Sequence, residues 1–140
     1  MNKGVMVPNR TSCARVLQRA LWVFLIGAIC GHAACLTSSE KAAAEKTGGN
    51  PRGGIDAIRR YGCPSCHIIP GIDEALGRTG PSLNGVANRA RIADALENTP
   101  ENLIRWVRDP RSIDLHTSMP TMQISESDAH DIAAYLYTLR

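Results

Sequence analysis

Residues 63–67 read Cys63-Pro64-Ser65-Cys66-His67, a Cys-x-x-Cys-His pentapeptide. This pattern is typical of the attachment site of a c-type haem. The two thiols add to the two vinyl groups of the porphyrin, and the two-residue gap lets both reach one edge of the ring. The histidine that follows lies beneath the iron and supplies an imidazole nitrogen as a ligand. The pentapeptide therefore predicts one covalently bound haem c, with His67 as an iron ligand.

Two other uses of a Cys-x-x-Cys pair fit the chain poorly. A thioredoxin-like redox pair requires a strand-to-helix turn within a βαβ pattern, and no alternating strand-like run flanks residues 63–67. A structural zinc site requires four ligands, usually in two spaced pairs. Apart from the pentapeptide, the chain after Cys35 offers only His116 and His130, which lack that spacing. Haem attachment is therefore the favoured interpretation.

The first 34 residues have the organisation of a bacterial export signal. A basic region without acidic residues precedes an apolar stretch at 21–29, and small residues at 31–34 are suited to cleavage. A membrane-spanning helix is the alternative, but the apolar stretch is short. The basic region holds four of the 16 basic residues, which leaves 12 against 13 acidic residues in the remainder. This near-neutral balance gives no indication of nucleic-acid binding.

Cys35 lies directly after Ala33 and Ala34, where a lipoprotein signal places its acylated cysteine. Residues 35–52 are polar, have no apolar periodicity and predict a flexible tether. Together these features favour a protein that is tethered to a membrane through Cys35. Ordinary cleavage near Ala34, which would leave a soluble protein with a free thiol, is the alternative.

Residues 53–140 are expected to form one small domain. The domain has few large apolar residues, so a buried haem would complete its core. The pattern predicts short helices over residues 54–61 and 92–97, a helix capped by Thr99 that stops before Pro110, and a last helix that starts at Ser125. Residues 68–88 are rich in glycine and proline and predict a loop. No β-strand is predicted.

The order of these motifs resembles a class I cytochrome c over residues 53–140. The run 98–110 and the segment 133–136 are similar to the cytochrome c domain fused to subunit II of some bacterial haem–copper oxidases. The copper-binding cupredoxin domain of such subunits has no counterpart in this chain. The resemblance implies an all-α fold in which short helices wrap around one covalently attached haem. It rests, beyond the pentapeptide, on Gly80-Pro81-Ser82-Leu83, Trp106 with Asp109-Pro110, and Met119-Pro120.

The resemblance also assigns roles to residues outside the pentapeptide. Met119 matches the distal iron ligand, whose neutral thioether raises the reduction potential relative to bis-histidine ligation. Met122 and His116 are the competing ligands. Pro81 matches the residue whose carbonyl accepts the second ring N–H of His67. The other matches are two residues that pack on the haem, Leu83 and Trp106, and one arginine that contacts a propionate, Arg89.

These features predict a one-electron carrier and no catalytic residue. Its iron would be held by His67 and Met119, which leaves no open position for a substrate. The expected partners are redox proteins of a respiratory chain in the periplasm: a dehydrogenase as donor, and a terminal oxidase or another cytochrome as acceptor. Two alternatives stay open. One is a haem enzyme or gas sensor with a displaceable sixth ligand, and the other is a permanent cytochrome subunit of a dehydrogenase or oxidase.

Overall fold

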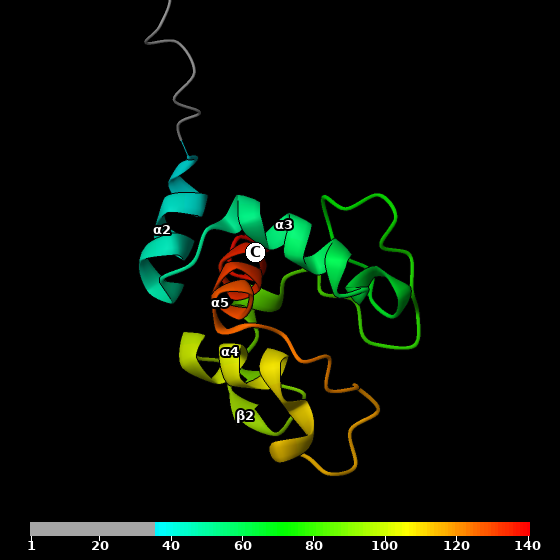
Figure 1. Cartoon of the computed structure of the whole chain (residues 1–140). Helices are drawn as coiled ribbons and strands as arrows, with labels where there is room; N and C mark the ends of the chain where they lie inside the picture. The colour runs from blue at the N-terminus through cyan, green and yellow to red at the C-terminus, as the bar shows by residue number, and fades with distance from the viewer. Residues whose placement is uncertain (1–35) are drawn as a thin grey trace, which may run out of the picture. The chain divides into compact units, whose positions relative to one another are not determined.

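The computed structural model describes residues 36–140, and these residues are mostly helical (Figure 1). The α-helices are α2 (Ser38–Thr47), α3 (Pro51–Arg60), α4 (Pro100–Arg108) and α5 (Glu126–Leu136). Three single-turn 3₁₀ helices lie between them: η2 (Cys63–Ser65), η3 (Val86–Asn88) and η4 (Pro110–Ser112). The small all-α fold expected from the sequence is confirmed. The predicted export signal at 1–34 and Cys35 lie outside the described residues.

Helix α5 is the element against which the other helices pack. Its N-terminus is fixed by Ser125, whose hydroxyl accepts a hydrogen bond from the backbone N–H of Asp128 at 3.1 Å. Its buried face carries Ala129, Ile132, Ala133 and Leu136 at helical spacing, as the sequence predicts. Helices α2, α3 and α4 all contact α5, and Figure 1 shows α3 crossing it.

The crossing of α3 over α5 depends on a glycine. A Cβ atom at Gly54 would lie only 2.2 Å from the carbonyl oxygen of Asp131 and 2.8 Å from Cβ of Tyr135. The two helix backbones can therefore approach closely only because Gly54 has no side chain. Helix α3 begins at Pro51, three residues earlier than predicted, because Asn50 caps it by accepting a hydrogen bond from the N–H of Arg52.

The other end of α3 is tied to the start of α5 by a tyrosine. The hydroxyl of Tyr61 donates to Oδ2 of Asp128 at 2.8 Å, and the guanidinium of Arg60 forms an ion pair with the same oxygen at 3.2 Å. The hydrogen bond from Tyr61, followed by one from Ser125, lowers the pKa of the Asp128 carboxyl below its usual range. Tyr61 therefore takes part in this crossing.

The prediction of a flexible tether at residues 35–52 is wrong for residues 38–47, which form helix α2. Thr37 and Glu40 form a reciprocal capping box at its start, and Gly48 ends the helix with a left-handed φ of 69°. The helix lacks an apolar stripe, but it buries Ala43 and the side chain of Thr47. Capping and tertiary contacts, rather than apolar periodicity, hold this segment.

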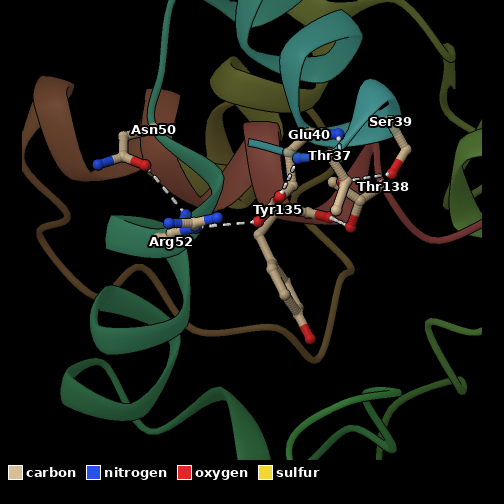
Figure 2. A network of polar contacts seen from close by, with 7 residues as sticks. All are labelled: Thr37, Ser39, Glu40, Asn50, Arg52, Tyr135 and Thr138. Atoms are coloured by element: carbon tan, nitrogen blue, oxygen red, sulfur yellow. Dashed lines mark hydrogen bonds and ion pairs between the residues drawn. The ribbon is translucent and has the colours of Figure 1, made fainter. Parts of the chain in front are cut away.

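Polar contacts fix α2 to the two helices beside it. The carboxylate of Glu40 accepts a hydrogen bond from Nε of Arg52 on α3 at 3.2 Å (Figure 2). After α2 ends, Oδ1 of Asp131 on α5 accepts a hydrogen bond from the backbone N–H of Asn50 at 2.7 Å. These contacts place the start of the described chain against α3 and α5.

The helix predicted over residues 92–97 is also wrong. This region is a β-hairpin of two antiparallel two-residue strands, β1 (Arg91–Ile92) and β2 (Leu96–Glu97). The turn between them places Ala93 and Asp94 at positive φ, 49° and 55°, which excludes a right-handed helix. The next helix, α4, starts and stops where the sequence predicts, with Thr99 accepting a hydrogen bond from the N–H of Asn102.

Among residues 36–140, no helix has the length and apolar character needed to cross a membrane.

Candidate haem site

The cysteine motif lies in a tight turn directly after α3. Gly62, with a φ of 71°, redirects the chain, and residues 63–65 form the single turn η2. The backbone N–H groups of Cys66 and His67 both donate to the carbonyl of Cys63, at 3.2 and 3.1 Å. This turn brings both thiols and the imidazole to one cavity wall. The two cysteines form no disulfide, and burial raises the pKa of the Cys63 thiol.

The imidazole of His67 is held in one orientation by the loop that follows. Its Nδ1 lies 2.7 Å from the carbonyl oxygen of Pro81, so Nδ1 carries the proton and donates this bond. The other ring nitrogen, Nε2, is then an acceptor. Gly80 lies against the ring: a Cβ there would be 2.4 Å from Cε1 of His67. Gly80 and Pro81, in the loop predicted at residues 68–88, thus hold the imidazole in place.

The loop that leads to α5 brings two methionines to the same cavity. Met119 and Met122 both line it, and both are half-buried. Met119 is positioned by a hydrogen bond from its backbone N–H to the hydroxyl of Thr117 at 3.2 Å. His116, the third ligand considered from the sequence, is exposed and does not line the cavity. Two thioethers, and no second imidazole, therefore line the cavity together with His67.

The cavity is about 300 Å³ in volume and mostly apolar. Three helices contribute to its walls: Ile58 of α3, Ile132 of α5 and the buried Trp106 of α4. The guanidinium of Arg89 reaches it while donating to the backbone carbonyls of Ser82 and Asn84. An apolar cavity of this kind suits a flat apolar cofactor with a few fixed polar contacts.

The structure brings all of the residues proposed from the sequence together in this cavity. They are Cys63, Cys66, His67, Pro81, Leu83, Arg89, Trp106 and Met119. Two free thiols, an oriented imidazole and a thioether around an apolar space fit the requirements of a c-type haem. Within the described range, His, Cys, Asp and Glu side chains form no group of three that could hold a separate metal ion.

Sequence reasoning missed the second arginine of the cavity, Arg91. The segment was predicted to be a helix from Ile92, so no face was assigned to the residues just before it. The available signal was a second arginine only two residues after Arg89, the arginine that the resemblance assigns. Of the two competing ligands named from the sequence, Met122 lines the cavity and His116 does not.

Comparison with known proteins gave matches to two kinds of relative. The chain is 35% identical over 88 residues to cytochrome c oxidase subunit 2 of Alkalihalophilus pseudofirmus, covering 62% of this chain and 25% of that subunit. It is 34% identical over 89 residues to cytochrome c oxidase subunit 2 of Bacillus sp. strain PS3, covering 61% of this chain and 25% of the relative. The chain thus spans about a quarter of the length of these subunits.

The other kind of relative is similar over nearly its whole length. Cytochrome c-552 of Bradyrhizobium diazoefficiens is 32% identical over 112 residues, which cover 80% of this chain and 92% of that protein. No family model matches the chain, and no solved structure does.

Proposed function

The chain belongs to the class I c-type cytochromes, and on that premise we propose that it carries single electrons between respiratory proteins on the periplasmic side of a membrane. Cys63 and Cys66 would hold one haem c by thioether bonds, and His67 and Met119 would be its iron ligands. When bound, the haem supplies an iron that accepts and releases one electron. No residue of the chain is assigned a catalytic role.

The observation that carries this proposal is the single apolar cavity that both the cysteine motif and Met119 line. The residues around it have separate tasks. The carbonyl oxygen of Pro81 accepts a hydrogen bond from Nδ1–H of His67, and this bond leaves Nε2 available to bind a metal. Leu83 and Trp106 are apolar walls that keep water away and favour the less charged, reduced state of the site. Two protein ligands would leave no position for a substrate.

A permanent subunit of a larger redox complex is the second candidate, because relatives of the chain are oxidase subunits. The two roles differ in stoichiometry. Purification of the protein from mildly solubilised membranes should give a cytochrome without stoichiometric companions if it is a free carrier. Constant co-purification with other subunits in a fixed ratio would favour the subunit role.

We further propose that the protein is tethered to the membrane through Cys35. Cys35 directly follows the predicted leader, at the position of an acylated cysteine. Cys35→Ser should therefore move the cytochrome from the membrane fraction to the soluble periplasmic fraction, as followed by haem staining after fractionation. Unchanged membrane attachment of this variant would favour an uncleaved leader helix, and a soluble wild type would overturn the tether.

The ligation is tested by a redox titration followed with optical spectra. Met119→Ala should abolish the weak sulfur-to-iron band of the ferric protein, lower the reduction potential and open the iron to carbon monoxide. Met122→Ala, which also removes a thioether that lines the cavity, is the matched control. It should leave the sulfur-to-iron band, the reduction potential and the response to carbon monoxide unchanged. If the wild type binds carbon monoxide rapidly, the site is an open one, as in a haem enzyme or gas sensor.

A further inference from the structure

The cavity is lined by basic side chains and by no acidic one. Apart from the two cysteine thiols, only Arg89, Arg91 and His67 among the residues that line this cavity can carry a charge, and no residue of the lining has a carboxylate. Two arginines therefore lie at a mostly apolar cavity. Such a distribution attracts a ligand with acidic groups at one edge and an apolar body.

The two arginines lie on either side of Ala90, where the chain bends, and both line the cavity. Arg89 has φ −75° and ψ 143°, and Arg91 lies in strand β1. The residue between them, Ala90, uses its carbonyl to accept a hydrogen bond from the N–H of Asn98 at 3.0 Å. This hydrogen bond fixes the backbone of the segment that carries the two arginines, both of which are exposed residues of the cavity lining.

Each arginine is held by neutral acceptors. Arg89 donates to the carbonyls of Ser82 and Asn84. Arg91 donates through Nε and Nη2 to the carbonyl of Asp94, at 3.2 and 2.6 Å. Neither forms an ion pair with an acidic group of residues 36–140. Carbonyl acceptors fix the direction of a guanidinium without cancelling its charge, so both cations are available to an anionic ligand.

The acceptor for Arg91 is placed by a strained turn. The N–H of Ala95 donates to the carbonyl of Ile92 at 3.0 Å, and the two central residues, Ala93 and Asp94, both have positive φ. Glycine or asparagine normally occupies the first of these positions. Left-handed backbone at an alanine persists only when surrounding contacts enforce it, and such strain often accompanies a functional site. Here the turn lies at the cavity, since Ala93 also lines it.

We propose that Arg91, oriented by the Asp94 carbonyl of this turn, is a second cation for the carboxylates of the porphyrin and raises the reduction potential of the site. This inference rests on the proposed function, because it requires a haem in the cavity. A positive charge near the iron favours the ferrous state, which has one positive charge fewer than the ferric state. Arg91 is thus a positioning and tuning residue, distinct from the iron ligands.

Other charged groups around Arg91 bear on this effect. Asp94 carries a carboxylate in the turn itself, and Glu97 is the cross-strand partner of Arg91 in the hairpin. Helix α4, which packs against β1, carries Glu101, Arg105 and Arg108. Of the cations on α4, Arg105 is exposed, hydrogen-bonded only to the amide oxygen of Asn102 and outside the cavity lining. It is therefore a matched control for the loss of one charge.

The experiment is a redox titration of the intact holoprotein between pH 5 and 9 in four forms: wild type, Arg91→Gln, Arg91→Lys and Arg105→Gln. We expect Arg91→Gln to have a lower midpoint potential than the wild type at every pH. The potential should also begin to depend on pH about one unit higher, because a carboxylate that loses a nearby cation titrates at higher pH. Arg91→Lys, which keeps the charge, should recover most of the potential. Arg105→Gln should match the wild type.

The inference is overturned if Arg91→Gln has the potential and pH dependence of the wild type, or if Arg105→Gln changes both to the same degree. It is also overturned if Arg91→Lys behaves as Arg91→Gln while the optical spectra of all forms agree, since charge would then be irrelevant. A wild-type protein without covalent haem in its optical spectrum would refute the proposed function instead.

Discussion

Replacing Gly80 with alanine should push the imidazole of His67 out of its position. A Cβ at Gly80 would lie 2.4 Å from Cε1, 2.7 Å from Nδ1 and 3.0 Å from Nε2 of that ring. Carbon atoms in favourable contact are about 3.5–4.0 Å apart, so ring and loop must separate by about 1 Å. The ring cannot move that far and keep its 2.7 Å hydrogen bond to the carbonyl of Pro81.

The magnitude follows from these two losses. Overpacking a filled site costs about 1–3 kcal/mol, and the hydrogen bond contributes about 0.5–1.5 kcal/mol. We therefore expect Gly80→Ala to lower the free energy of unfolding by about 2–4 kcal/mol, as measured by urea unfolding of the holoprotein. Because His67 is the proposed iron ligand, the optical spectrum should also gain a component from haem without imidazole ligation.

Gly85→Ala is the control for this substitution. Gly85 has a φ of 63° and no atom within 4 Å of a built Cβ, so alanine there meets backbone strain but no neighbour. It should cost about 1–2 kcal/mol and leave the spectrum unchanged. The reasoning is refuted if Gly80→Ala is as stable as the wild type with an unaltered spectrum, or if both variants change the spectrum equally.

Three further predictions concern folding and stability. Changing both Cys63 and Cys66 to alanine should give a chain with little helical circular dichroism, because the proposed haem would complete the core; cooperative melting at native helical content would contradict this. Because the pKa of Asp128 is lowered in the folded protein, its carboxylate stabilises the fold above the ordinary titration range of aspartate, and this stability is lost as pH falls through the lowered pKa. Urea midpoints between pH 6 and 2 should therefore fall less steeply in Asp128→Asn than in the wild type. Parallel curves for the two proteins would exclude this contribution. Ala93→Gly should raise the urea midpoint slightly, because glycine relieves a φ of 49°, and a clear decrease would show that the turn is unstrained.

Much of the helical structure is predictable because its signals are local. Thr99 and Ser125 cap α4 and α5 through hydrogen bonds to N–H groups three residues away, so the caps are readable in the sequence itself. The apolar stripe of α5 is likewise a property of one segment. The region at 92–97 was read wrongly for the opposite reason. Its hairpin depends on left-handed backbone at Ala93 and Asp94, which their residue types disfavour.

The proposed haem chemistry of the site follows from the sequence alone, since the spacing of Cys63, Cys66 and His67 is set by covalent geometry within five residues. Tertiary structure decided what surrounds that motif. The Tyr61–Asp128 bond joins residues 67 positions apart, and the Asn50–Asp131 bond, which helps to order the segment next to α2, joins residues 81 apart. No local pattern encodes such pairs, because they form only when the helices pack. The approach of Arg91 to the cavity has the same cause: it depends on a strained turn and on strand pairing, which the packed domain stabilises.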